Sequence, residues 1–381
     1  KGGKAHKNGI NDVSMGTTSD SWDCDTCKEK RKYCQGHYGA IKLNYPVVSP
    51  LYIKEIIKWL KVICFNCGHL LVPYTKLPVP RSKILDEYVE ICTKGSKEMT
   101  CSNKNCGAIH PHVSKNKADA TSINISITKK DSEEETTTTL YPHLIESIFS
   151  KITNQTVLDM GTSIEKHPKH FIIRYLRVGP NSIRPESKKL TNGRPTSNNI
   201  TALYSLVIKF NDEIPNVIPA KIGEDLEAKI HNLNLAVYAL IRGINNPNKR
   251  NIVHGKTALE SICARWPGKT GRIRGNILGK RVNNMARSFI ICNPELRLDE
   301  VGIPKFMCRI LNVKETVREY NYNRLLQFFI NGKNKYPGCQ RVESKRTGVV
   351  MDVDKVTKLE IGDIIYRDIV DHDIVLFNRQ P

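Results

Sequence analysis

Closely spaced cysteines near the start of this chain limit its possible folds more than any other feature does. Eight of the twelve cysteines lie before residue 110. The first group lies in CDTCKEKRKYCQGH, where spacers of two residues let paired side chains converge on one ion. Four nitrogen or sulfur ligands satisfy tetrahedral zinc, whereas the alternative is a set of free thiols. The predicted ligands of a first structural zinc ion are Cys24, Cys27, Cys34 and His37.

A second group begins with CFNCGH and needs two further ligands from later in the chain. The segment CSNKNC supplies the best candidates, because its spacer of four residues can still turn back on itself. Cys92 stands alone in a helical pattern, and we interpret it as a small buried apolar residue. Three histidines remain possible substitutes for one ligand: His69, His110 and His112. The predicted second set is Cys64, Cys67, Cys101 and Cys106.

Both predicted sites use four protein ligands and leave no coordination position open to water. A catalytic zinc ion needs such a position, so the pattern favours a structural role over zinc-dependent hydrolysis. No run of eighteen apolar residues occurs, and the opening KGGKAHKNGIND has no apolar core. The sequence therefore predicts neither a membrane span nor a signal peptide, and we expect an intracellular protein whose cysteines stay reduced.

The chain carries a large excess of positive charge. Its 59 Lys and Arg residues outnumber its 38 Asp and Glu residues, and the net charge of +21 favours a polyanionic partner. Six of these cations lie among glycines in GKTGRIRGNILGKRVNNMARSFI, residues 268–290. This segment is either a solvated basic face or a flexible element whose cations pair with phosphates. The candidate phosphate ligands are Lys269, Arg272, Arg274, Lys280, Arg281 and Arg287.

Helical and strand-like patterns share the rest of the chain. Apolar spacing predicts helices over residues 51–62, 200–210, 224–242 and 318–332, and the second and third of these form a helical hairpin. Residues 127–143 are polar and rich in Thr, which favours a surface hairpin or loop, and the chain after residue 290 is β-rich. The predicted fold class is therefore α+β, with several zinc-containing modules and a helical hairpin followed by a β-rich region.

Five blocks of the sequence occur in the order that a known family uses. They are CDTCKEKRKYCQGHYGAIKL, LKVICFNCG, GRIRGNILGKRVNNMARSFI, LDEVGIP and DIVLFNRQP. Together they resemble the N-terminal third of the largest subunit of multisubunit DNA-dependent RNA polymerase. The spacing in CSNKNC and the short GKNKYPGC segment are most similar to the versions that large cytoplasmic DNA viruses encode.

The resemblance implies four modules. They are a zinc-binding clamp core over residues 1–126, a clamp head with a lid loop and a helical hairpin over residues 127–252, a rudder and switch segment over residues 253–290, and a dock with the start of the active-site region over residues 291–381. The lid falls on residues 182–199, where composition alone also allows a solvated linker.

The resemblance also implies roles for single residues. The two cysteine groups fall on the two zinc sites of the clamp, and the basic segment falls on a switch that grips template phosphates. Arg379, in FNRQP, falls on the loop below the incoming nucleotide and points at its ribose. A guanidinium suits this contact because its fixed fork of donors reaches hydroxyl and phosphate oxygens together. One departure is WPGKTGR, where Pro267 and Thr270 replace a Lys and a Glu of the family.

The family's reaction is nucleotidyl transfer by two metal ions, Mg²⁺ in the full enzyme, held by the acidic side chains of an NADFDGD loop. This loop does not occur here, so we expect part of an enzyme subunit that grips template DNA and the DNA/RNA hybrid but does not polymerise alone. The acidic pairs Asp352/Asp354 and Asp371/Asp373 are interpreted as turn and surface residues. Expected partners are the second-largest and other polymerase subunits, in a viral factory in the cytoplasm, a virion or a nucleus. The alternative is a stand-alone zinc-ribbon transcription factor that binds nucleic acid.

Overall fold

The chain forms two compact units, Lys1–Gly275 and Asn276–Pro381. The computed structural model describes residues 5–75, 78–94, 99–116, 122–128, 135–191, 194–215, 223–243, 253–254, 257–283 and 285–379. Residues 192–193 of the predicted lid and 255–256 of the predicted rudder lie outside these ranges.

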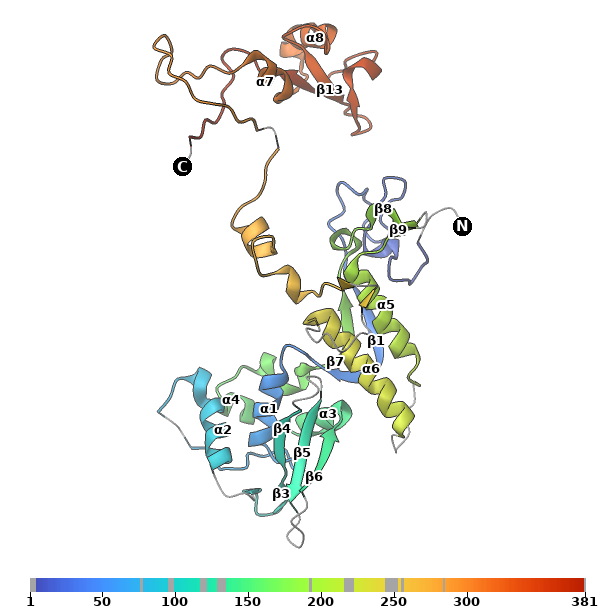
Figure 1. Ribbon diagram of the computed structural model, residues 1–381, viewed down its shortest axis with the longest axis vertical. Helices are drawn as coiled ribbons and strands as arrows, with labels where there is room; N and C mark the ends of the chain where they lie inside the picture. The colour runs from blue at the N-terminus through green and yellow to red at the C-terminus, as the bar shows by residue number, and fades with distance from the viewer. Residues whose placement is uncertain are drawn as a thin grey trace. The chain divides into compact units, whose positions relative to one another are not determined.

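The first core of Lys1–Gly275 packs helices against a three-stranded sheet (Figure 1). Helix α1 buries Ile53, Ile56 and Leu60, whose spacing of three and four residues places them on one side of the helix. The sheet is antiparallel with the order β4-β5-β6, and Val113 and Ile123 from it join the same core. The elements are α1 (Ile53–Val62), α2 (Ile84–Lys94), β4 (His112–Lys115), β5 (Ile123–Thr128), β6 (Glu135–Leu140), α3 (Pro142–Ser150) and α4 (Asn154–Asp159).

The second core lies between a two-stranded antiparallel sheet and two helices. Successive side chains of a strand point to opposite faces, and the residues of one face, such as Leu43 and Leu176, are buried against the helices. The helices form the predicted hairpin, and the Asn198 side chain starts the first of them by accepting a hydrogen bond from the Ile200 N–H (3.1 Å). The elements are β1 (Gly39–Val48), β7 (Ile172–Val178), α5 (Asn199–Asp212) and α6 (Glu224–Ile241).

Short elements complete this unit. Three hairpins pair β2 with β3, β8 with β9, and β10 with β11. Their bounds are β2 (Met99–Thr100), β3 (Ile109–His110), β8 (Ser187–Thr191), β9 (Arg194–Thr196), β10 (Val253–His254) and β11 (Thr257–Ala258). Single helical turns lie at Val13–Met15, Arg81–Lys83, Ile164–Lys166, Pro168–Phe171, Asn181–Ile183 and Cys263–Arg265. A short π-helix, Ile273–Ile277, lies where the two units meet in the sequence.

The unit Asn276–Pro381 is built on a four-stranded antiparallel sheet with the order β12-β15-β13-β14. Helix α8 covers it and buries Leu325 and Phe328 against Val342 and Ile365 of the sheet. The elements are α7 (Lys305–Ile310), β12 (Asn312–Thr316), α8 (Tyr322–Asn331), β13 (Cys339–Glu343), β14 (Val350–Asp352) and β15 (Ile364–Asp368), with single turns at Glu319–Asn321 and Val353–Lys355.

The mixed helices and small sheets confirm the predicted α+β class. The four helices expected from apolar spacing are present as α1, α5, α6 and α8. The surface hairpin expected over residues 127–143 is part of a larger sheet, because β5 begins at Ile123 and also pairs with β4. No helix within the described ranges is long and apolar enough to cross a membrane.

Candidate functional site

The first cysteine group converges on one point in the folded chain. The ligand atoms of Cys24, Cys27, Cys34 and His37 all lie within 4.8 Å of one another, and 3.8 Å separates Cys34 Sγ from His37 Nε2. Burial opposes ionisation of Cys24, but hydrogen bonds from the backbone N–H groups of Cys27 and Thr26 lower the pKa of this thiol overall. A thiolate is the form that binds a metal ion, so these backbone donors favour coordination by Cys24.

The second group assembles the predicted four cysteines from two separate hairpins. Sγ–Sγ distances are 3.7 Å between Cys64 and Cys106 and 3.5 Å between Cys67 and Cys101, and all four atoms lie within 4.8 Å of one another. None of the three candidate histidines belongs to this group. Cys92 is buried beside it, as predicted, and burial raises the pKa of its thiol to about 11.

These sulfur separations fit a shared metal ion. Zn–S bonds of about 2.3 Å in tetrahedral geometry place sulfur atoms roughly 3.8 Å apart. A disulfide would bring them to about 2.05 Å, and all twelve cysteines are free. Hydrogen bonds from the Ala108 backbone N–H and from Asn66 Nδ2 (3.4 Å) lower the pKa of the Cys106 thiol to about 7. Both groups could therefore hold a metal ion.

A glycine closes the first turn of the second group. Gly68 follows Cys67 directly and has a φ of +73°, a backbone conformation that side chains with a Cβ rarely adopt. The Gly68 N–H donates to the Cys64 carbonyl (2.9 Å), which closes the loop around the two thiols. A Cβ at Gly68 would also lie 2.6 Å from the carbonyl oxygen of Lys151. This position therefore excludes larger residues for two independent reasons.

Two arginines hold the base of the predicted lid, and composition gave no reason to single them out. Arg184 is buried and donates to the Gly179 carbonyl (2.9 Å) and to Asn181 Oδ1 (2.8 Å). Arg265 donates to the Ile183 carbonyl (3.1 Å) and to Asn198 Oδ1 (2.7 Å), at the two ends of the lid. An open pocket of about 270 Å³ beside these contacts is lined from both the lid base and residues 260–272. The lid base and the start of the basic segment are thus connected within one unit.

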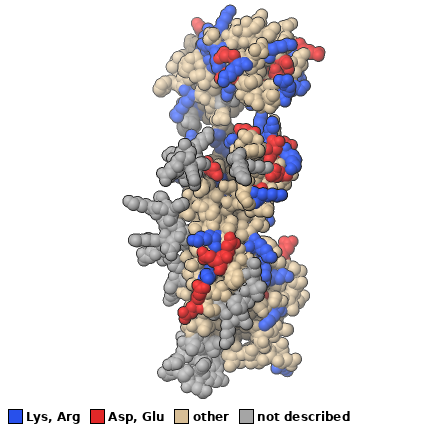
Figure 2. Space-filling model, turned by 90° about the vertical axis from the view of Figure 1, so that its right-hand side faces the viewer, with Lys and Arg blue, Asp and Glu red and all other residues tan. Residues whose placement is uncertain are grey.

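All six predicted phosphate ligands of the basic segment are exposed. The first three belong to the unit Lys1–Gly275 and the last three to Asn276–Pro381. Neither Lys269 nor Arg274 forms an ion pair with a described carboxylate, and the same holds for Lys280, Arg281 and Arg287. On the face drawn in Figure 2, basic and acidic side chains are interspersed, so the net charge does not form one continuous field there.

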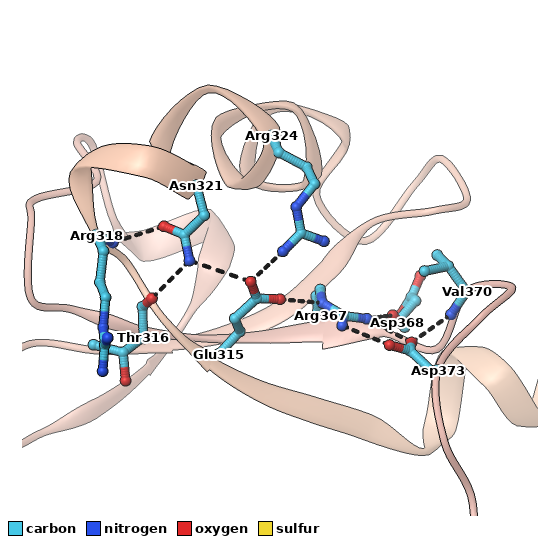
Figure 3. A network of polar contacts seen from close by, with 9 residues as sticks. All are labelled: Glu315, Thr316, Arg318, Asn321, Arg324, Arg367, Asp368, Val370 and Asp373. Atoms are coloured by element: carbon cyan, nitrogen blue, oxygen red, sulfur yellow. Dashed lines mark hydrogen bonds and ion pairs between the residues drawn. The ribbon is translucent and has the colours of Figure 1, made fainter.

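A buried guanidinium organises one end of the sheet in Asn276–Pro381 (Figure 3). Arg367, from β15, donates twice to Asp373 (2.7 and 2.8 Å) and once to Glu315 of β12 (2.7 Å). Hydrogen bonds to Asp373 and Glu315 raise the pKa of Arg367 above its usual range. Glu315 is also bound by Arg324 and by Asn321 Nδ2 (3.2 Å). This network fixes Asp373, after which residues 374–379 form no helix or strand.

Asp352 and Asp354 are exposed, as the sequence suggested, and so is Asp371, whereas Asp373 lies at a turn with a side chain only 17% exposed. Asp352 and Asp354 both lie near the Lys333 ammonium (3.4 and 3.3 Å), and Asp373 is occupied by Arg367. Arg379 is exposed beyond this turn. Within the described ranges, the groups of three or more potential metal ligands are the two cysteine sites alone.

Comparison with known proteins identifies matching families and relatives. The family descriptions "RNA polymerase Rpb1, domain 1" and "RNA polymerase Rpb1, domain 2" match residues 1–277 and 279–381. The DNA-directed RNA polymerase RPB1 homolog of African swine fever virus (strain Badajoz 1971 Vero-adapted) is 37% identical over 98% of this chain and 26% of its own length. DNA-directed RNA polymerase subunit 1 of Acanthamoeba polyphaga mimivirus is 30% identical over 98% of this chain and 27% of its own length. DNA-directed RNA polymerase subunit Rpo1N of Thermococcus celer is 30% identical over 98% of this chain and 42% of its own length.

The chain spans about a quarter of the length of these viral relatives. The identity to the African swine fever virus protein exceeds that to the archaeal one, in agreement with the resemblance to versions encoded by large DNA viruses. Consecutive matches to two Rpb1 domains favour a polymerase subunit over a stand-alone zinc-ribbon factor. The chain belongs to the Rpb1 family, the largest subunits of RNA polymerase.

Proposed function

We propose that this chain forms the clamp, lid, rudder, switch and dock of the largest subunit of a DNA-dependent RNA polymerase, where it grips template DNA and the DNA/RNA hybrid. Membership of the Rpb1 family supports this proposal. The observation that carries it is the basic segment, whose exposed Lys280, Arg281 and Arg287 have no carboxylate partner among the described residues. Cations without an internal partner are available to phosphates.

The proposed grip is electrostatic. Each Lys or Arg that contacts a phosphate displaces condensed counterions, so binding becomes weaker as salt rises. Such contacts hold the strand in position but do not read its sequence. Gly279, which follows the short π-helix and lies in no helix or strand, lets the backbone after it follow the strand.

Both cysteine groups bind zinc in this proposal. Thiolates, with one imidazole in the first site, are ligands that zinc accepts in closed tetrahedral structural sites. Zinc, when bound, joins hairpins that have little apolar core of their own, since the buried cluster at the second site consists of Leu71, Cys92 and two of the ligands. The residues Cys64, Cys67, Cys101 and Cys106 hold the second ion, and Cys24, Cys27, Cys34 and His37 hold the first.

The four modules then act within a complete polymerase. Their bounds are residues 1–126, 127–252, 253–290 and 291–381. Arg379 contacts the ribose of the incoming nucleotide, and Arg367 and Asp373 fix the turn that precedes it. Mg²⁺ binds to the acidic loop of the complete subunit rather than to these residues. The partners are the second-largest and other polymerase subunits, and the site of action is a viral factory, a virion or a nucleus.

The test is the salt dependence of binding to single-stranded DNA and to a DNA/RNA hybrid. The double variant Arg281→Glu plus Arg287→Glu is expected to bind more weakly. Its plot of log affinity against log salt is expected to be shallower by roughly 1.4, because a single strand contributes about 0.7 per phosphate contact. Fluorescence anisotropy over a series of salt concentrations measures this slope.

The matched control is Arg346→Glu plus Lys358→Glu, which changes the same charge at two exposed positions of the same unit. This control is expected to keep the original slope. An unchanged salt slope in the Arg281/Arg287 variant would show that these two residues of the switch do not contact nucleic-acid phosphates. An equal change in both double variants would show that only net charge matters.

A further inference from the structure

The two-stranded sheet β1–β7 has one covered face and one open face. Its covered face packs on α5 and α6. The register places Ala40 opposite Arg177 and Lys42 opposite Tyr175, and all four are exposed. Tyr38 lies two residues before Ala40, and the Arg177 guanidinium lies over its ring, 5.2 Å from the centroid. The open face therefore carries Tyr38, Ala40, Lys42, Tyr175 and Arg177.

The two tyrosines are unusual for a surface sheet. Tyr38 is 67% exposed and Tyr175 is 66% exposed, so neither ring contributes its large apolar area to a core. Tyr175 faces Lys42, which lies four residues after Tyr38, and Tyr38 directly precedes β1. Four residues of extended chain span about 13 Å at roughly 3.3 Å per residue. Rings this far apart cannot enclose one planar ligand between them. The Tyr175 ring and the face of the Tyr38 ring opposite the Arg177 guanidinium are instead each available to a separate planar group.

The cations of this face are also available. Neither Lys42 nor Arg177 forms an ion pair with a carboxylate in the described part of the chain. The nearby Arg174 differs, since its guanidinium is held by Glu146 (2.6 and 2.8 Å). The open face thus alternates aromatic rings with cations along two paired strands.

We propose that this face binds single-stranded nucleic acid. Two bases stack on Tyr38 and Tyr175, and the backbone phosphates pair with Lys42 and Arg177. Exposed aromatic side chains on a sheet, combined with cations, are how proteins hold unpaired bases with little sequence preference. An acidic peptide would use the cations but would leave both rings without a planar partner. The surface is separate from the basic switch segment and adds a second contact to the proposed grip.

The experiment measures binding of a short fluorescein-labelled oligouridylate to the zinc-loaded 381-residue chain by anisotropy. The double variant Tyr38→Leu plus Tyr175→Leu removes both rings but keeps apolar side chains. Its affinity is expected to fall at least tenfold, because stacking contributes roughly 1–3 kcal/mol per base. The double variant Tyr38→Phe plus Tyr175→Phe keeps both rings and is expected to bind as the unsubstituted chain does.

A second pair of changes separates the rings from the charges. Lys42→Gln plus Arg177→Gln is expected to make the salt slope shallower by roughly 1.4, whereas the Leu variant keeps the slope and loses affinity. An oligomer without bases is expected to bind the unsubstituted chain and the Leu variant equally weakly. The matched control is Tyr320→Leu, a tyrosine that is 80% exposed in the other unit, and it is expected to bind normally.

Unchanged affinity of the Leu variant, with its zinc content intact, would overturn the proposal. An equal loss of affinity in the Leu variant for oligomers with and without bases would also overturn it. So would competition by polyglutamate for the oligomer if the Leu substitutions had no effect on affinity. Comparison of oligouridylate with oligodeoxythymidylate distinguishes an RNA from a DNA strand as the bound species. A negative result for the open sheet face does not affect the proposed contact of the switch segment with phosphates, because the Arg281 and Arg287 substitutions test that contact separately.

Discussion

Replacement of Arg367 by Met tests the polar network of Figure 3 most directly. Methionine is unbranched and keeps much of the side-chain volume beside Phe328, whose ring centroid lies 5.8 Å from the guanidinium carbon. The substitution removes the cation that neutralises Glu315 and Asp373. The two carboxylates remain where they are, with side chains only 21% and 17% exposed.

The expected loss of unfolding free energy is about 3 kcal/mol. Removal of one partner from a buried ion pair typically costs about 3–5 kcal/mol, because an uncompensated charge stays buried. The lower end applies here since both carboxylates keep other partners. Glu315 retains Arg324 and Asn321, and Asp373 still accepts a hydrogen bond from the Val370 N–H (2.9 Å).

The loss is also expected to depend on pH. The hydrogen bond from Arg367 is the largest cause that lowers the pKa of Asp373 below its usual value. A lowered carboxyl pKa stabilises the fold above the unfolded-state pKa of about 3.9, and this contribution disappears as pH falls through the folded-state pKa. The difference between the native chain and Arg367→Met is therefore expected to be largest near neutral pH and to shrink below about pH 4.

The assay needs a signal from each unit. The three tryptophans, Trp22, Trp59 and Trp266, all lie in Lys1–Gly275, so their fluorescence in urea follows that unit alone. Amide hydrogen exchange of the buried strand β15 and of its partly exposed neighbour β12 reports on the opening of the other unit. We expect the substitution to lower the opening free energy of these strands and to leave the tryptophan transition unchanged.

Arg346→Met is the matched control, because Arg346 is exposed and has no described carboxylate partner. It is expected to change stability by less than about 0.5 kcal/mol. Equal exchange of β12 and β15 in both variants at neutral pH would refute the view that Arg367 stabilises the turn at Asp373. A loss that does not shrink in acid would contradict the electrostatic explanation.

Two further predictions concern the cysteine groups. Elemental analysis is expected to find about two zinc ions per chain, and a result of one or none would contradict the ligand assignment. Gly68→Ala is expected to lower the thermal midpoint and the zinc content, because the Cβ would meet the Lys151 carbonyl at 2.6 Å in a backbone conformation that disfavours it. Gly223→Ala, where a Cβ meets nothing within 4 Å and φ is −80°, is the control, and equal effects of the two changes would contradict this reasoning.

Local spacing made the cysteine groups predictable from sequence. A pair separated by two residues converges whatever surrounds it, and the structure brings together the predicted set of eight ligands. The polar network in the other unit was not predictable in this way. Strands β12 and β15 pair Glu315 with Ile365 and Val313 with Arg367. The ion pair between Glu315 and Arg367 is therefore diagonal, and it exists only in this register. The bonds from Arg265 to the two ends of the lid, 67 and 82 residues away, likewise depend on the tertiary fold.

Net charge alone overstates how many cations a protein offers to a ligand. Arg184, Arg265 and Arg367 add to the total of +21, yet their donors are directed at carbonyls, amides or carboxylates of the chain itself. The cations that remain available are those that are exposed and lack such partners, as Lys42 and Arg177 do on the open sheet face and Arg281 does in the basic segment. Substitution of a cation that is bonded within the chain should alter the free energy of unfolding with little change in the salt slope of binding. Substitution of an exposed cation without such a partner should alter the salt slope with little change in the free energy of unfolding. Measurement of the unfolding free energy and the salt slope for each variant therefore separates the cations that stabilise the fold from those that contact nucleic acid.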